Sequence, residues 1–324
     1  KALLADGTSR IRKKIAVFGG STTSDIVKTL ELFLLDAGIE PEFYESEYAQ
    51  YFQDAMFPDE TLLSFKPDIV FIHTTNRNVT DWPEMTDTTE QIDEKLHTEI
   101  NRFTAMWKSI AEKFHCPIIQ NNFEMPLYRL LGSRDAWDIH GRTNFLTRLN
   151  EAFYAYAREN ESFYIHDLNF VSADYGLKEW SNPLFWNMYK YAMCFEAIPS
   201  FAFSVSHIIK SIFGKNKKAL ALDLDNTLWG GVVGDDGVDG IEIGQETGVS
   251  QSYYEFQTYV KQLKSLGIVL TVCSKNDHEN AIAGLNHPEG ALRPDDFVII
   301  KANWENKDRN IAETAAELNI LPDS

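Results

Sequence analysis

The chain of 324 residues has little cysteine and no long apolar run. Its three cysteines, Cys116, Cys194 and Cys273, are scattered and odd in number. This pattern argues against a disulfide framework and favours a reducing cytoplasm. The longest apolar candidate for a membrane span, residues 201–213, is interrupted by serine and histidine and is too short to cross a bilayer. The composition therefore predicts a globular protein of the cytoplasm.

Positive charge is also scarce, because the chain has 30 lysines and arginines but 48 aspartates and glutamates, which gives a net charge of −18. Such a chain repels nucleic acid and anionic membranes, so we expect neither as a partner. A phosphorylated substrate stays compatible with this charge, because a metal and local cations can invert the field inside a site. The chain begins without methionine and stops at LPDS, so we expect a fragment.

The first two thirds of the chain alternate short apolar strands with amphipathic helices. This alternation predicts a doubly wound α/β domain with a parallel sheet, whose polar strand ends gather at one edge. Residues 180–203 are aromatic and irregular, which is typical of core or domain-interface packing. The expected strands are residues 14–18, 42–44, 68–73, 117–120 and 163–165, and the expected main helices are residues 25–36, 88–114, 143–159 and 204–213.

A basic linker, GKNKK at residues 214–218, follows this region and marks a domain boundary. We therefore expect one domain over residues 1–214 and a second over residues 215–324. The lengths and patterns predict two three-layer αβα domains.

Two polar strand ends of the first domain resemble the SGNH (GDSL-type) hydrolases. Ser21 lies where that family keeps its nucleophilic serine, and Asn76 where it keeps its oxyanion-hole asparagine. The family's Asp-x-x-His pair has no counterpart, since His166 and Asp167 have the wrong order and His207 lacks an aspartate three residues before it. A serine without a base is a poor nucleophile, so Ser21 is read either as an esterase nucleophile or as a helix-capping or anion-binding hydroxyl.

The second domain opens with KKALALDLDNTLWGG, residues 217–231. Residues 220–224 predict a buried parallel strand, with Asp223 and Asp225 at its carboxyl end. Two carboxylates at such an edge are costly to bury without a partner, and a cation would stabilise both. The alternative is a strand that ends in a polar turn, with Asp225 as a helix cap.

This stretch resembles the Asp-x-Asp-x-Thr signature of the haloacid dehalogenase (HAD) superfamily. The resemblance implies that Asp223 attacks phosphorus to form an aspartyl phosphate, while Asp225 acts first as acid and then as base. It also implies a Mg²⁺ ion held by Asp223, by Asp225 through its backbone carbonyl, and by the phosphate. Residues 229–244 suggest a β-hairpin flap, and no room is left for a large cap.

Two later positions fit the same chemistry. Ser274 follows a buried strand, residues 268–273, and precedes a helix, so its hydroxyl either binds phosphate or caps that helix. Lys307 lies in the last helix, expected from about residue 303 to 318, and would neutralise the phosphate rather than face solvent. Asp295 and Asp296 read as loop and cap residues. The resemblance implies phosphate contacts from Leu224, Ser274, Lys275, Asn276 and Lys307.

The motifs together, DLDNTLWGG, VCSKN and ANWENK, resemble the FkbH-like branch of that superfamily (subfamily IIIC), which usually carries an SGNH-like partner domain. The resemblance implies a phosphatase or glyceryl transferase that takes a glyceryl phosphate donor or another phosphorylated small molecule, with an acyl carrier protein as acceptor. The branch expects a further acidic pair, which would lie after Ser324. The alternatives are a carrier- or glycan-binding scaffold and an esterase that uses Ser21.

Overall fold

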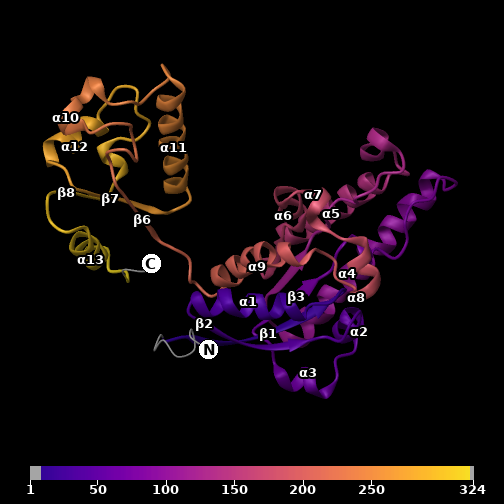
Figure 1. Cartoon of the computed structure of the whole chain (residues 1–324). Coiled ribbons are helices and arrows are strands. Elements are labelled where there is room, and N and C mark those ends of the chain that lie inside the picture. Colours follow the sequence, from indigo (N-terminus) through magenta and orange to yellow (C-terminus); the bar gives the residue numbers. More distant parts are fainter. Residues whose placement is uncertain (1–8, 322–324) are drawn as a thin grey trace. The chain divides into compact units, whose positions relative to one another are not determined.

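The computed structural model describes residues 9–321, which belong to two compact units, Lys1–Gly214 and Lys215–Ser324. The predicted boundary falls between them. Both units are built from parallel sheets flanked by helices, which confirms the α/β class (Figure 1). None of the helices in the described residues has the length and apolarity that a membrane crossing requires.

The N-terminal unit contains a five-stranded parallel sheet in the order β2-β1-β3-β4-β5, the flavodoxin-like order. The register pairs Ile15 with Ile69 and Val70 with Ile118, so the carboxyl ends of these strands meet at one edge. The strands are β1 (Ile11–Gly19), β2 (Ile39–Glu45), β3 (Ile69–His73), β4 (Ile118–Asn121) and β5 (Phe163–His166).

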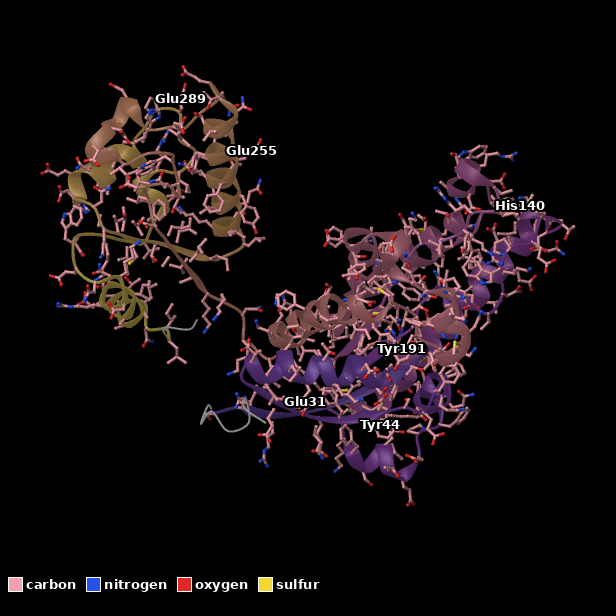
Figure 2. The ribbon with its side chains drawn as sticks, in the orientation of Figure 1. Glu31, Tyr44, His140, Tyr191, Glu255 and Glu289 are labelled. Atoms are coloured by element: carbon pink, nitrogen blue, oxygen red, sulfur yellow. The ribbon has the colours of Figure 1, made fainter. Side chains whose placement is uncertain are left out.

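Alternation along β1 divides the core of this unit in two. Ile15 and Val17 pack with α1 (Ser24–Asp36) and α9 (Ile198–Ile212) on one face of the sheet. Ala16 and Phe18 pack on the other face with α4 (Thr89–Phe114) and α5 (Arg142–Glu159). Figure 2 shows the side chains that fill the space between the sheet and these helices. The unit is therefore a three-layer αβα sandwich.

Local sequence signals set the ends of several helices. Thr88 and Gln91 form a capping box at the start of α4, with the Thr88 amide donating to Gln91 at 2.8 Å. The shorter elements of this unit are α2 (Tyr51–Met56), α3 (Glu60–Phe65), η2 (Asn76–Asn78), η3 (Gly132–Ala136), α6 (Leu168–Tyr175), α7 (Leu177–Trp180), α8 (Pro183–Tyr189) and η4 (Phe195–Ala197).

The C-terminal unit contains a three-stranded parallel sheet in the order β6-β7-β8, formed by β6 (Ala219–Leu222), β7 (Val269–Ser274) and β8 (Ile299–Ala302). Leu270 and Val272 belong to the apolar core of this unit. Cys273 lies next to α13 (Lys307–Glu317), with its thiol 3.7 Å from the carbonyl oxygen of Lys307. The other elements are α10 (Val233–Asp236), η5 (Val238–Gly240), α11 (Gly248–Ser265), α12 (His278–Leu285) and η6 (Pro294–Asp296).

The predicted β-hairpin flap over residues 229–244 is wrong in detail. A single antiparallel bridge joins Gly230 to Glu242, and the residues between them form α10 and η5 instead of paired strands. The carboxylate of Asp236 accepts the amide of Val232 at 2.7 Å and stabilises a helical turn there. Local side-chain bonding of this kind competes with a strand ladder.

Two helix starts also differ from the prediction. The aromatic segment is less irregular than expected, since α8 begins at Pro183 and α9 begins at Ile198 with a proline in its first turn, where proline is tolerated. In contrast, α13 begins at Lys307, later than expected, because Asn303 bonds the amide of Glu305 at 3.0 Å and keeps that segment in a turn.

Candidate active site

The carboxyl edge of the C-terminal sheet brings three predicted residues together. Asp223 follows β6 directly, Ser274 ends β7, and Lys307 is the first residue of α13 after β8. The parallel register pairs Leu222 with Val272 and Ser274 with Ala302, so these strand ends lie side by side. The topology therefore assembles residues that are up to 84 positions apart.

The central contact of this edge is an ion pair. The Lys307 Nζ donates to Asp223 Oδ2 at 2.5 Å, and the Leu224 amide donates to Asp223 Oδ1 at 2.8 Å. Burial alone would raise the pKa of Asp223, but the hydrogen bonds from Lys307, Ser274 and the Leu224 amide outweigh it and lower that pKa below its ordinary value. Asp223 is thus an anion at neutral pH, and its side chain stays 36% exposed and open to a ligand.

Asp225 is held by three donors. Its Oδ1 accepts the indole N–H of Trp229 at 2.9 Å and the amide of Val233 at 3.1 Å, and its Oδ2 accepts the Asn276 side chain at 2.9 Å. Gly284 packs so closely on Trp229 that an added Cβ would lie 2.8 Å from its ring. The orientation of this carboxylate is therefore fixed by packing as well as by hydrogen bonds.

The three residues predicted to contact phosphate at the end of β7 differ in their burial. Ser274 and Asn276 are buried at this edge, and Asn276 binds Asp225 directly. Lys275 is exposed, and no hydrogen bond or ion pair joins its side chain to another residue among residues 9–321. Ser274 and Asn276 thus belong to the assembled edge, whereas Lys275 lies at its rim.

Trp229 is the residue that sequence reasoning missed. A buried indole N–H usually finds an acceptor, and Trp229 follows Asp225 by four positions in the same loop. That spacing is the one sequence signal that could have identified its role.

A metal ion would find the carboxylate of Asp223 and the backbone carbonyl of Asp225 at this edge, because the Asp225 carboxylate is already held by three donors. Within residues 9–321, no three histidine, cysteine, aspartate or glutamate side chains gather closely enough to form a metal site by themselves. Mg²⁺ commonly binds through one or two carboxylates and completes its shell with water and substrate oxygens. The donor set fits this ion chemically.

Asp295 and Asp296 lie apart from this chemistry, as expected. The carboxylate of Asp296, in η6, accepts a hydrogen bond from the backbone amide of Arg293 at 2.9 Å. It also forms an ion pair with Lys264 of α11 at 2.9 Å. Asp296 thus stabilises this turn.

Ser21 and Asn76 occupy the carboxyl ends of β1 and β3 in the N-terminal unit. Ser21 is 2% exposed, and its Oγ has no hydrogen-bond partner among the described residues. Asn76 donates instead to Glu124, through its amide to the side chain at 3.1 Å and through its side chain to the backbone at 3.3 Å. The described residues supply no base that is hydrogen-bonded to Ser21.

Two buried histidines lie near this edge without serving Ser21. His73 and His166 both bond Asn121 at 2.8 Å, and His166 also contacts Ser204 at 3.1 Å. Burial lowers the pKa of each histidine to about 3, so both are neutral at neutral pH. They form a buried polar network that joins β3, β4 and β5.

Glu124 gives a pH-dependent prediction. Burial raises its pKa from 4.5 to about 8, so the folded state binds a proton more tightly than the unfolded chain. That contribution to stability is fully present below about pH 4.5 and is lost as pH rises through about 8. Glu124→Gln, which carries no charge, should therefore gain stability relative to the wild type as pH rises from 5 to 8.5 in urea unfolding.

The control for this measurement is Glu151→Gln, which removes an exposed carboxylate from α5. Its stability relative to the wild type should not follow the same trend. A flat difference between Glu124→Gln and the wild type across this pH range would contradict the assignment.

Comparison with protein families matches residues 14–210 to the family described as "FkbH, N-terminal domain". Among solved structures, the N-terminal part of the protein BF1531 from Bacteroides fragilis contains a phosphatase domain and is complexed with Mg. The two chains are 28% identical, and they superpose with a TM-score of 0.87. The match covers 99% of this chain and 83% of that chain. A search of curated proteins gave no significant match.

Two other solved structures are less similar to this chain. A putative acylhydrolase from Bacteroides fragilis is 17% identical, with 66% of this chain and 94% of that chain covered and a TM-score of 0.36. A putative lipolytic protein of the G-D-S-L family from Desulfitobacterium hafniense is 20% identical, with 60% and 99% covered and a TM-score of 0.38. At these TM-scores the likeness does not establish a shared fold, so the SGNH-like character of the N-terminal unit stays a prediction.

Proposed function

The chain belongs to the FkbH N-terminal domain family, and on that premise we propose that its C-terminal unit is a magnesium-dependent phosphatase of the HAD type. The observation that carries the proposal is the contact of Lys307 with Asp223 at the carboxyl edge of the sheet. The likeness to a Mg-complexed structure that contains a phosphatase domain supports it.

Asp223 is the proposed nucleophile. Its pKa is lowered and its side chain is partly exposed, so an anionic oxygen is available to attack phosphorus and form an aspartyl phosphate. Lys307 would then offset the negative charge that grows on the phosphoryl oxygens. The amide of Leu224 and the hydroxyl of Ser274 supply further donors at the same edge.

Asp225 is the proposed acid and base. It would donate a proton to the leaving oxygen and later accept one from the attacking water. The donors Trp229, Val233 and Asn276 hold its carboxylate in one orientation, which such a transfer needs. Through its side chain Asn276 is therefore a positioning residue for Asp225, and its predicted contact with phosphate stays a prediction.

Magnesium would be held by the Asp223 carboxylate and by Asp225, and when bound it supplies charge neutralisation at the phosphoryl group. The ammonium of Lys307 approaches Asp223 from the same edge, so a bound metal would add a second positive charge to that of Lys307. This combination explains how a chain of net charge −18 can accept an anionic substrate.

The substrate class that fits is a phosphorylated small molecule. The family resemblance narrows it to a glyceryl donor whose acyl group is activated as an acyl phosphate. The thiol of an acyl carrier protein would attack the acyl carbon, and phosphate would leave as the thioester forms. No segment large enough to form a separate cap lies between β6 and α11, so a bulky acceptor could approach the edge. Release of phosphate from such an acyl phosphate, coupled to acylation of a carrier-protein thiol, would identify that substrate.

A metal-removal experiment tests the phosphatase directly. Hydrolysis of p-nitrophenyl phosphate by the full chain should need Mg²⁺ and fall at least about a hundredfold with EDTA, because a metal stabilises several kcal/mol of developing charge. Ser21→Ala is the matched control, since it removes a hydroxyl without a partner and should leave the rate unchanged. Turnover that persists in EDTA would contradict the proposal.

An anion soak separates this function from a structural scaffold. Tungstate or vanadate, both phosphate mimics, should occupy a position between Asp223, Ser274 and Lys307 in a crystal. An anion found elsewhere, together with no hydrolysis, would favour the scaffold.

A further inference from the structure

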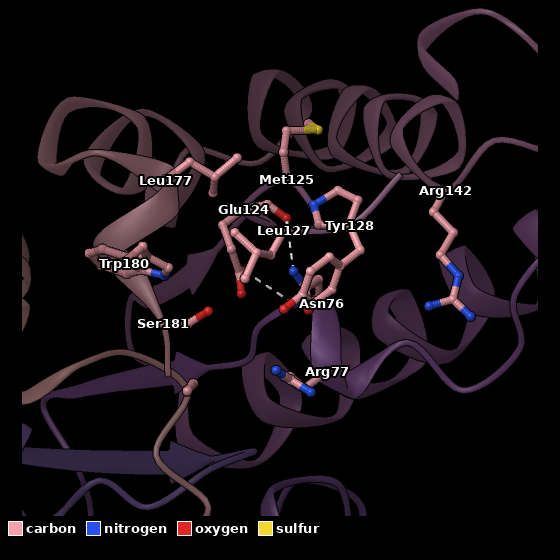
Figure 3. A pocket seen from close by; sticks show the side chains of 12 residues that line it. Asn76, Arg77, Glu124, Met125, Leu127, Tyr128, Arg142, Leu177, Trp180 and Ser181 are labelled. Carbon is pink, nitrogen blue, oxygen red and sulfur yellow. Dashed lines mark hydrogen bonds between the residues drawn. The ribbon is translucent and has the colours of Figure 1, made fainter. Parts of the chain in front are cut away.

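The N-terminal unit contains a pocket of about 120 Å³ beyond the carboxyl ends of β3 and β4. Figure 3 shows Asn76 and Glu124 joined at its centre, with Arg77 beside them and Arg142 farther out at the rim. Leu177 and Trp180 contribute an apolar wall. The residues that line this pocket lie between positions 76 and 192, so the pocket shares none of them with the edge that carries Asp223.

The two arginines of this pocket are held by aromatic rings instead of carboxylates. The guanidinium of Arg77 lies 4.8 Å from the ring centroid of Trp186, and that of Arg142 lies 4.9 Å from Trp82. Neither forms an ion pair with a carboxylate among residues 9–321, whereas Arg102 in the same unit does. In a chain of net charge −18, unneutralised guanidinium groups at a pocket favour an external anion.

The buried carboxyl of Glu124 does not cancel this charge. Its side chain is 3% exposed, and burial raises its pKa to about 8, so the group is neutral at pH 7 and can donate a proton in a hydrogen bond. The amide of Asn76 already donates to its Oε2 at 3.1 Å. The pocket therefore offers cations and donors to a ligand, with no competing anion at neutral pH.

The volume limits the size of the group that enters. About 120 Å³ corresponds to roughly four water molecules, at a share of about 30 Å³ each in the liquid. A wider groove lined by Tyr175, Lys178 and Phe185 shares Leu127, Tyr128 and Ser181 with the pocket. The pocket can thus take a small acid, or the acidic end of a longer molecule whose remainder lies in the groove.

We propose that this pocket binds the oxyanion of a small acid, a carboxylate or a phosphate monoester, with Arg77 and Arg142 as its cationic partners. The proposal is independent of the phosphatase, because it uses none of the residues near Asp223. It gives the N-terminal unit a ligand-binding role that needs no nucleophilic serine.

Calorimetric titration of the full chain in EDTA tests this site, with sodium propionate and inorganic phosphate as separate probes. Arg77→Ala and Arg142→Ala should each weaken binding of the preferred anion by about tenfold or more, the loss expected for a charge-assisted hydrogen bond. Tighter binding of propionate assigns a carboxylate, and tighter binding of phosphate assigns a phosphate monoester. Phosphate could also bind near Asp223. Only the part of the binding heat that disappears in Arg77→Ala is therefore assigned to the pocket.

The matched control is Arg158→Ala, which removes an exposed charge from the far end of α5. It should leave the affinity within about twofold, because surface charges are screened by salt. Arg77→Lys keeps the charge and loses the bidentate geometry, so it should still weaken binding if Arg77→Ala does not fold. Unchanged affinity in the pocket variants, an equal loss in Arg158→Ala, or no saturable binding of either anion would overturn the proposal.

Discussion

Asp223→Asn should lower Mg²⁺-dependent hydrolysis of p-nitrophenyl phosphate by at least about a thousandfold, because the amide is a poor nucleophile at phosphorus. The substitution also removes the negative partner of Lys307 and a proposed ligand of the metal, so it should weaken metal binding as well. The measurement is the initial rate at saturating Mg²⁺, with circular dichroism to show that the variant is folded. The expected loss of stability is small, since an ion pair this exposed contributes at most about 1 kcal/mol.

Asp295→Asn is the matched control for this prediction. It removes one exposed aspartate from the same unit, in η6, and leaves the strand edge intact. Its rate should stay within about twofold of the wild type, as expected for a surface substitution away from the site. Turnover by Asp223→Asn that matched the control would remove Asp223 from the chemistry.

The arrangement of this edge could be predicted from the sequence because each residue follows an apolar strand. Parallel strands end at one edge, so a motif after β6, another after β7 and a lysine after β8 must converge. The contact between Lys307 and Asp223 is the outcome of that rule. The parallel sheet of the N-terminal unit follows from the same alternation of strands and helices.

The contacts that orient Asp225 could not be predicted in the same way. Asn276 was expected to bind phosphate, whereas its side chain donates to Asp225, and Trp229 had no assigned role. Both contacts depend on how the loop after β6 packs on α12, where Gly284 admits the indole ring. Tertiary packing of this kind leaves little trace in local sequence patterns.

Residues 229–244 show why local patterns can mislead. Glycine and aspartate are frequent in hairpin turns, so the composition predicted a β-hairpin. The same residues also stabilise short helical turns, and the bond from Val232 to Asp236 selects that form here. One antiparallel bridge, between Gly230 and Glu242, is the part of the expected hairpin that exists.

The pocket around Glu124 was also hidden from the sequence. The position of Asn76 at a strand end could be predicted, but its hydrogen-bond partner, Glu124, lies 48 residues further along the chain. A glutamate side chain is usually exposed to solvent, so nothing in the sequence indicated that this one is buried. Burial is what changes the chemistry of this carboxyl, and burial is a property of the folded chain.

Trp107→Ala should destabilise the N-terminal unit by about 3–5 kcal/mol, the range for removing a buried aromatic side chain. Trp107 is 1% exposed, and its ring centroid lies 4.7 Å from that of Phe153 and 4.6 Å from that of Phe163. Its indole N–H also donates to Gln120 at 3.0 Å, so the variant leaves a buried amide oxygen unpaired. The measurement is urea unfolding of the full chain, compared with the wild type.

Trp137→Ala removes the same side chain from a position that is 68% exposed, where it contacts Arg134 through its ring at 5.5 Å. This control should cost less than about 1 kcal/mol, because little apolar area leaves the core and an exposed cation–π contact is weak. A wide separation between the two variants is expected because helices α4 and α5 pack on the sheet through the aromatic cluster around Trp107. Equal losses of stability in the two variants would mean that this aromatic cluster contributes little to packing α4 and α5 on the sheet. The N-terminal unit would then be stabilised chiefly by the core on the other face of the sheet.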